Sequence, residues 1–230
     1  MKINKYTGIF IAIGSALVFF YACSSGYQKN KTEVVIHELS DADMLNPVNY
    51  TDAGAGYIVK NIFQGLLDID FKTSELMPIL AESRPTIEKT AKGGLLITYR
   101  IRPEAKWDNG TPITAKDVEF SLKVIKNPKV NNPQVKSYFE FINDFKFYND
   151  DPLKFTFVCD TVYILAESAS GGISILPTYF YDPKGLMKDF TVNDLTINKD
   201  KLASDPKIFF PHSFFGIKIL SKFIDFRVGS

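Results

Sequence analysis

A strand, a tight turn and a capped helix follow one another over residues 95–126, and this unit constrains the fold more than any other stretch. Every second residue from Leu95 to Ile101 is apolar, which predicts a strand with one buried face. Asp108-Asn109-Gly110 then supplies turn residues, of which Asn and Gly tolerate a positive φ. Thr114 and Asp117 have the spacing of a helix capping box. The apolar positions that follow recur at helical spacing, and they are Ala115, Val118, Leu122 and Ile125. None of these side chains is a reactive group, so the unit is predicted to be scaffold.

Two further stretches are predicted to add strands to the same region. Residues 139–148 and 153–159 are strand-like, and Asn149-Asp150-Asp151-Pro152 forms a turn between them. Lys92-Gly93-Gly94 is a hairpin turn signal before the strand that starts at Leu95. Cys159 ends an alternating apolar face, which predicts an inert position in the core.

The composition excludes several classes of function. Lys and Arg number 27 and Asp and Glu number 26, and no basic stripe suggests binding to nucleic acid. His37 and His212 share no ligand-like spacing with Cys159, which argues against a zinc site. The sequence around Ser170 lacks the first glycine of a nucleophile elbow. We therefore expect neither an enzyme nor a bound metal or cofactor.

The N-terminus is typical of an exported protein. Lys2 and Lys5 precede an uncharged apolar run, and residues 1–22 are predicted to be a signal peptide. Tyr21-Ala22-Cys23-Ser24 resembles a lipobox, so Cys23 is expected to carry lipid and to anchor the protein to a membrane. The alternative is an uncleaved membrane anchor over the same residues. Residues 23–33 are polar and are predicted to be a tether, and either interpretation places the remaining chain outside the cytoplasm.

A glycine-containing stretch precedes the first predicted helix. Ala53-Gly54-Ala55-Gly56-Tyr57 is predicted to be a loop in which glycine lets the backbone approach a ligand, and residues 58–67 are predicted to be helical. A dinucleotide fingerprint is disfavoured because the third glycine is missing. A plain connector remains the alternative.

Several phrases of the sequence resemble one known family. The stretch from Trp107 to Ser121 resembles the signature of the family 5 extracytoplasmic solute-binding proteins, the oligopeptide- and dipeptide-binding components of ABC importers. Leu45-Asn46-Pro47, residues 76–81 and the Leu-Pro step at the end of residues 173–177 resemble other phrases of that family, in the same order.

The resemblance implies a two-lobed α/β periplasmic-binding fold of type II with an extra inserted domain. It assigns residues 34–67 to the first part of lobe I, residues 68–162 to the inserted α+β domain and residues 163–230 to the return to lobe I. The family continues from a Val-Gly step into a second lobe, whereas this sequence stops at Val228-Gly229-Ser230. The expectation is therefore a fragment with only the first lobe and the inserted domain.

The function implied by the resemblance is capture of a solute, above all a peptide, for import. The expected partners are a peptide or other small solute, the permease of an ABC importer, and the membrane through lipidated Cys23, in the periplasm if the cell is Gram-negative. The family lines its cleft with the loop that corresponds to Ala53–Tyr57, which is therefore the expected ligand-binding segment. The alternative is a truncated lipoprotein that does not transport and has a structural or interaction role.

Overall fold

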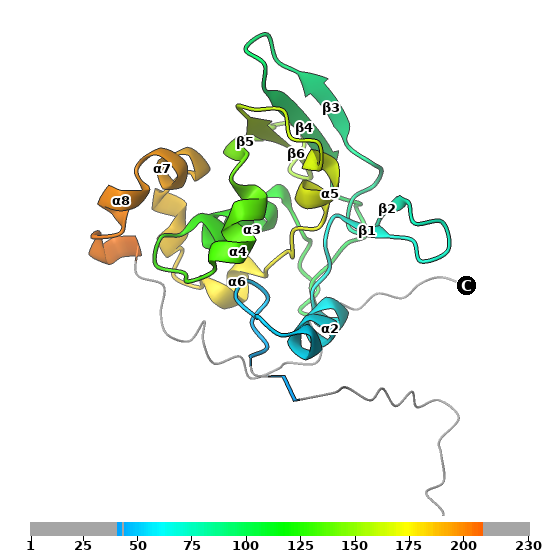
Figure 1. Ribbon diagram of the computed structural model, residues 1–230, viewed down its shortest axis with the longest axis horizontal. Helices are drawn as coiled ribbons and strands as arrows, with labels where there is room; N and C mark the ends of the chain where they lie inside the picture. The colour runs from blue at the N-terminus through cyan, green and yellow to red at the C-terminus, as the bar shows by residue number, and fades with distance from the viewer. Residues whose placement is uncertain (1–40, 43, 209–230) are drawn as a thin grey trace, which may run out of the picture. The chain divides into compact units, whose positions relative to one another are not determined.

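A four-stranded antiparallel sheet lies at the top of the molecule in Figure 1, with the strand order β3-β4-β6-β5. The structure is a computed structural model that describes residues 41, 42 and 44–208. A two-stranded antiparallel pair, β1-β2, lies beside the sheet. The elements in chain order are α2 (Ala53–Ile62), β1 (Leu67–Ile69), β2 (Leu76–Pro78), β3 (Thr86–Lys89), β4 (Leu95–Arg100), α3 (Ala115–Lys126), α4 (Pro133–Phe139), β5 (Ile142–Phe147), β6 (Lys154–Cys159), α5 (Ala166–Gly171), α6 (Thr178–Tyr181), η1 (Leu186–Asp189), α7 (Val192–Ile197), α8 (Lys199–Leu202) and η2 (Pro206–Ile208).

The sheet is held together by an aromatic cluster on one face. The predicted alternation in β4 is confirmed, because Leu95, Ile97 and Tyr99 are buried while the residues between them are partly exposed. The Tyr99 ring stacks on Phe155 with centroids 5.8 Å apart, and Phe155 stacks in turn on Phe145 at 5.2 Å. Offset aromatic contacts of this kind add stability beyond the area that they bury. The two strands predicted at residues 139–148 and 153–159 are present as β5 and β6, although β5 starts only at Ile142 because Phe139 ends α4, and Cys159 lies in the core as expected.

The two edges of the sheet differ. At one edge, β5 contacts α7. At the other edge, β3 pairs with β4 and with no other strand of the described residues, and all four residues of β3 are exposed. The β3–β4 hairpin turns at Gly93, whose φ of +85° lies in the left-handed region, as the glycine pair predicted.

Helix α3 is the central helix of the described fold, and it contacts α4, α6 and α7 (Figure 1). Its predicted apolar face is buried, with at most 2% of Ala115, Val118, Leu122 or Ile125 exposed. Asp117 and Ser121 on the same helix are buried as well, although they are polar. A helix that is buried on several sides needs hydrogen-bond partners for such residues.

A buried network supplies those partners. The Asp117 carboxylate accepts hydrogen bonds from the backbone N–H of Thr114 at 2.9 Å and from the Thr178 hydroxyl at 2.9 Å. It also accepts longer bonds from the Thr114 hydroxyl and the Thr178 N–H, both at 3.3 Å. Ser121 donates to the carbonyl of Asp117 at 2.7 Å and accepts from the N–H of Leu176 at 2.8 Å. The predicted cap at Thr114 is thus confirmed, and the same carboxylate joins α3 to the start of α6.

Three expectations about local structure need correction. Ala53–Tyr57 is the first half of α2 and not a loop, and α2 ends at Ile62 rather than near residue 67. The family resemblance implies a strand that ends in the Leu-Pro step of residues 173–177, but these residues form no strand, and the N–H of Ile175 donates to the carbonyl of Gln64 at 3.0 Å. Residues 33–37 are a further candidate strand by their sequence, and they lie outside the described residues.

Replacing the carboxylate at the centre of the network is expected to destabilise the fold. Asp117→Ala leaves the donors of Thr114 and Thr178 without their acceptor in a buried site, which should lower the free energy of unfolding by about 2–4 kcal/mol. Urea denaturation of the full chain measures this change. Asp150→Ala is the control, because Asp150 is exposed, and a change of at most about 0.5 kcal/mol is expected there. Equal midpoints for the two variants would refute the role given to Asp117.

The two adjacent glycines of the β3–β4 turn provide a matched pair. A Cβ added at Gly94 would lie 2.1 Å from the carbonyl oxygen of Cys159, whereas one added at Gly93 would meet nothing within 4 Å. Gly93→Ala is strained only by its positive φ and should cost about 1 kcal/mol. Gly94→Ala must displace the start of β4 from β6 and should cost more than about 3 kcal/mol. Thermal unfolding compares the two, and the reverse order would contradict the packing.

Candidate functional site

The segment predicted to bind ligand forms the N-terminal half of α2. Asp52 is the N-cap, with an extended backbone at φ −104° and ψ 154°, and its Oδ1 accepts a hydrogen bond from the N–H of Ala55 at 2.7 Å. Asp52 therefore satisfies one of the donors that a helix start leaves open. The N–H groups of Ala53 and Gly54 have no acceptor among the described residues. These two donors lie at the positive end of the helix dipole, where a carbonyl oxygen could be held, whereas the Asp52 carboxylate, whose Oδ2 is buried and has no hydrogen-bond partner among the described residues, disfavours a second carboxylate.

The five predicted residues differ in their exposure. Gly54, Ala55 and Gly56 are buried, Ala53 is exposed, and Tyr57 has 61% of its surface exposed. Gly56 packs against the Tyr50 ring, because a Cβ at position 56 would lie 3.1 Å from Cε2 of that ring. The small residue at position 56 therefore serves packing inside the protein. Tyr57 is the exposed aromatic side chain of the segment.

Sequence reasoning missed the role of Asp52. An Asp directly before a helix is a recognised start signal, and it stands immediately before Ala53. The two nearby glycines weigh against helix on intrinsic propensity, which favoured the loop interpretation. The cap and the packing of Tyr50 outweigh that cost, so the helix starts five residues earlier than predicted.

The turn at residues 108–110 is at the start of the stretch that resembles the family signature, and we call it the signature turn. It lies next to α6 and has a structural role. Trp107 is buried, and its ring meets the Tyr179 ring edge to face with centroids 6.3 Å apart. The Tyr179 hydroxyl donates a hydrogen bond to Asp108, and burial together with this bond raises the pKa of Tyr179. Gly110, at φ +82°, closes the turn by donating to the carbonyl of Trp107 at 2.9 Å. These contacts support the predicted scaffold role of the turn.

The described residues do not assemble a recognisable reactive centre. No group of three or more His, Cys, Asp or Glu side chains within residues 41–42 and 44–208 could hold a metal ion. Burial raises the pKa of the Cys159 thiol to about 12, so the thiolate is scarce at neutral pH. His37 and His212 lie outside the described residues. Within the described part of the chain, no helix is long and apolar enough to cross a membrane.

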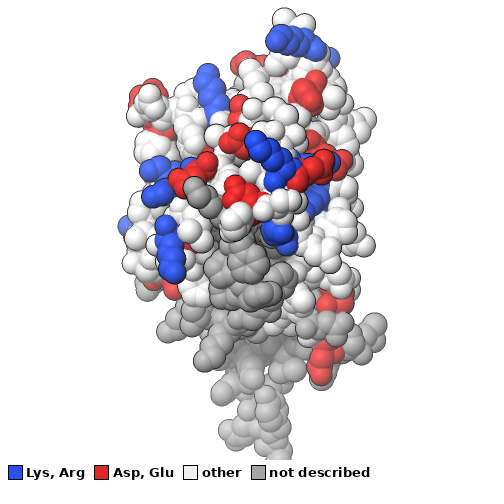
Figure 2. Space-filling view, turned by 90° about the vertical axis from the view of Figure 1, so that its left-hand side faces the viewer, with Lys and Arg blue, Asp and Glu red and all other residues white. Residues whose placement is uncertain are grey.

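Charges of both signs are interspersed on the side of the molecule that carries α7 and α8, as Figure 2 shows. Ion pairs also link elements elsewhere. Arg100 binds Glu82 and Asp151, each at 2.8 Å, and Arg84 binds Glu167 at 2.6 Å. Arg100 and Arg84 donate the hydrogen bonds in these pairs, which lower the pKa of Asp151 and raise the pKa of Arg84. Because these side chains are substantially exposed, the pairs add specificity to the fold more than stability.

Comparison with known proteins identifies the family. Residues 75–202, more than half of the chain, match the family model for bacterial extracellular solute-binding proteins, family 5, middle region. The oligopeptide-binding protein OppA of Bacillus subtilis is 31% identical over 136 residues, which are 56% of this chain and 23% of that protein. The chain therefore spans about a quarter of the length of this curated relative.

Solved structures show the same fold. The oligopeptide-binding protein AppA of Bacillus subtilis, solved with a nonapeptide, matches with a TM-score of 0.51 and 20% identity, over 69% of this chain and 29% of AppA. NikZ of Campylobacter jejuni, solved with Ni(L-His), also matches with a TM-score of 0.51, at 24% identity over 67% of this chain and 28% of NikZ. The expected mixed α/β class is confirmed, and it corresponds to part of those larger structures.

The family consists of solute-binding proteins and not of enzymes, in agreement with the expectation from the sequence. The matched residues include the signature turn, helix α3 and the network around Asp117. These features contain the stretch from Trp107 to Ser121, whose sequence resembles the family most specifically. The chain belongs to the family 5 bacterial extracellular solute-binding proteins.

Proposed function

We propose that this protein captures an extracytoplasmic solute, and specifically a peptide, for delivery to the permease of an ABC importer. Its family, and the similarity to an oligopeptide-binding protein and to a structure that holds a nonapeptide, support this function. NikZ was solved with Ni(L-His), so membership of the fold alone leaves other solutes open. The observation that favours a peptide is the start of α2, where two backbone donors without acceptors among the described residues lie close to an exposed tyrosine.

The proposed ligand-binding segment is Ala53–Tyr57. A peptide offers a carbonyl oxygen at every residue, and the N–H groups of Ala53 and Gly54 are neutral donors that match such an oxygen. Recognition of the main chain does not depend on the peptide's side chains, and it suits a protein that must bind many sequences. Tyr57 would add an aromatic contact to a side chain of the peptide.

We also propose the division into parts that the family resemblance implied. Residues 34–67 and 163–230 would belong to lobe I, and residues 68–162 would form the inserted domain that contains the sheet and α3. The described residues share a single apolar core, so the inserted domain would be packed firmly on lobe I.

The attachment to the membrane is proposed to be a lipid on Cys23. The lipobox-like sequence supports it, and export to the outside of the cytoplasm agrees with membership of an extracellular binding family. A lipid anchor would keep the binding protein near its permease, which raises the local concentration of captured solute.

Tyr57→Ala is expected to weaken peptide binding without affecting the fold. Loss of one aromatic contact should reduce the affinity for a fluorescently labelled nonapeptide pool about tenfold, which corresponds to about 1.4 kcal/mol. Because Tyr57 is 61% exposed, the thermal stability of the variant should match that of the parent. Fluorescence polarisation of the full chain measures the affinity.

Lys60→Ala is the matched control, since Lys60 is exposed on the same helix and lies outside the proposed segment. Its affinity for the pool should equal that of the parent. The peptide proposal fails if the parent does not bind the pool. The assignment of the segment fails if Tyr57→Ala binds as well as the parent does.

Lipidation is tested by metabolic labelling of the producing cells with an alkyne fatty acid. The parent and Cys159→Ala should incorporate the label, and Cys23→Ser should not, because thioether attachment of lipid requires the thiol at position 23. Cys159 is the only other cysteine of the chain, which makes its variant the natural control. Label that persists in Cys23→Ser would rule out this anchor.

A further inference from the structure

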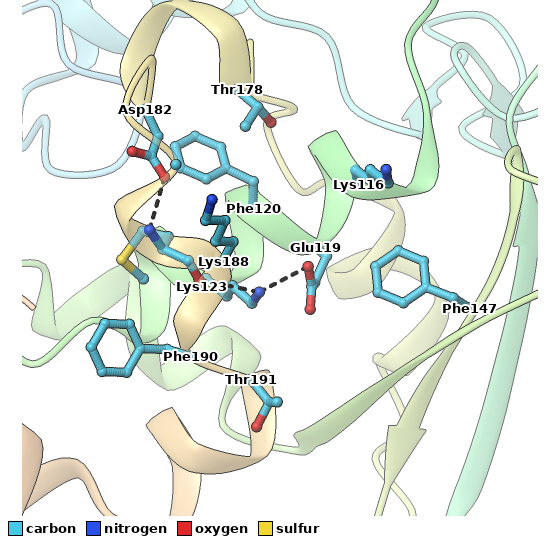
Figure 3. A pocket seen from close by; sticks show the side chains of 12 residues that line it. Lys116, Glu119, Phe120, Lys123, Phe147, Thr178, Asp182, Lys188, Phe190 and Thr191 are labelled. Carbon is cyan, nitrogen blue, oxygen red and sulfur yellow. Dashed lines mark hydrogen bonds and ion pairs between the residues drawn. The ribbon is translucent and has the colours of Figure 1, made fainter.

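A hollow of about 380 Å³ lies on the described part of the protein, and none of its lining residues belongs to Ala53–Tyr57. It is formed by α3, β5, α6 and the chain around η1, and Figure 3 shows it from close by. The lining residues are Lys116, Glu119, Phe120, Lys123, Phe147, Thr178, Asp182, Gly185, Met187, Lys188, Phe190 and Thr191. It is large enough for a small organic molecule.

The inner wall of the hollow is apolar. Phe120, Met187 and Phe190 line it and are themselves buried, so each turns only a small part of its surface toward the space. Phe147 of β5 lines another part of the wall and has 42% of its surface exposed. An aromatic or aliphatic group that entered the hollow would exchange water for these side chains, which is favourable.

Three of the charged groups at the hollow already have partners. Lys123, which is 5% exposed, donates to Glu119 at 2.9 Å and to the carbonyl of Met187 at 3.4 Å. Burial raises the pKa of Glu119, and the bond from Lys123 opposes that rise. The Asp182 carboxylate accepts from the N–H groups of Leu186 and Met187, at 2.7 and 2.8 Å. Lys123 and Glu119 therefore neutralise each other, and each oxygen of the Asp182 carboxylate has a backbone hydrogen bond.

Two lysines are left without such partners. Neither Lys116 nor Lys188 forms an ion pair within the part of the chain that the structure describes. Figure 3 shows the two side chains reaching the hollow from different elements, with Glu119 and Lys123 between them in that view. The Lys188 chain also packs against Gly185, since a Cβ there would lie 3.3 Å from its Cδ. The hollow thus combines an apolar wall with three lysines and two carboxylates, and two of the lysines, Lys116 and Lys188, form no ion pair with the described residues.

We propose that this hollow binds a small apolar carboxylate, such as an aryl-alkanoate or a medium-chain fatty acid. The apolar body would contact Phe120, Phe190 and Phe147, and the carboxylate would pair with the ammonium group of Lys116 or of Lys188 at the rim. A dianion such as phosphate fits less well, because most of the wall is apolar and the carboxylates of Glu119 and Asp182 repel a double negative charge more than a single one. The site is separate from the proposed peptide segment and does not depend on it.

Titration of the full chain with 4-phenylbutyrate at pH 7.5, followed by saturation-transfer NMR, tests this site. 4-Phenylbutyrate should bind about tenfold more tightly than 4-phenyl-1-butanol, which has a similar body and no charge. The lysines attract the carboxylate and not the alcohol, and each exposed charge pair contributes modestly. Lys116→Ala combined with Lys188→Ala should weaken 4-phenylbutyrate binding about tenfold. A higher salt concentration should weaken the binding of 4-phenylbutyrate more than the binding of 4-phenyl-1-butanol, because salt screens the attraction between charges.

Two control variants show whether the carboxylate binds in this hollow and not elsewhere on the protein. Lys184→Ala removes an exposed lysine that lies close in sequence to Lys188 but does not line the hollow, and it should bind like the parent. Tyr57→Ala should also bind like the parent, which separates this site from the peptide segment. The proposal is overturned if the alcohol binds as tightly as the carboxylate, if the double variant binds like the parent, or if 4-phenylbutyrate does not bind at millimolar concentration.

Discussion

The buried carboxylate of Asp117 is the interaction on which the described fold depends. A single side chain caps its own helix through Thr114 and, 61 residues later in the chain, fixes the start of α6 through Thr178. Ser121, one turn further along α3, adds a second link to the same segment. Such a group is costly to bury and is stable only while all its donors stay in place. The helix in the middle of the fold and the chain that leaves the sheet are therefore positioned as one unit, and α6 in turn meets the signature turn through Tyr179.

The parts of the fold that could be predicted from the sequence are those determined by local pattern. The alternation in β4, the glycine pair before it and the periodicity of α3 all depend on residues a few positions apart, and all agree with the structure. The start of α2 was predicted wrongly because its glycines favour a loop locally, whereas the cap by Asp52 and the packing of Tyr50 on Gly56 favour a helix. The hollow beside α3 could not be predicted, since Lys116 and Lys188 are brought together only by the tertiary fold. The local sequence predicts Asp117 as part of the helix cap. It could not show that the same carboxylate also accepts a hydrogen bond from Thr178, which lies 61 residues later.

The family and the geometry carry different information about function. The most specific sequence of the chain, from Trp107 to Ser121, forms a turn and the first half of α3, and its buried residues serve the scaffold by which the family is identified. The start of α2 is less distinctive in sequence, and it is the segment to which the proposed function assigns the contacts with a solute. Proteins of the same fold have been solved with ligands as different as a nonapeptide and Ni(L-His). A scaffold that is kept while its binding surface varies explains how one fold serves such different solutes.

The exposed strand β3 bears on how the protein behaves at high concentration. An unpaired strand edge can accept a strand from another molecule, and this is a common first step of aggregation. β3 is only four residues long, and it ends in the charged residues Glu88 and Lys89; short length and charge are both features that protect an edge strand. The opposite edge is protected by α7, which contacts β5. A short and charged edge therefore helps to keep copies of the protein from joining their sheets when they are concentrated.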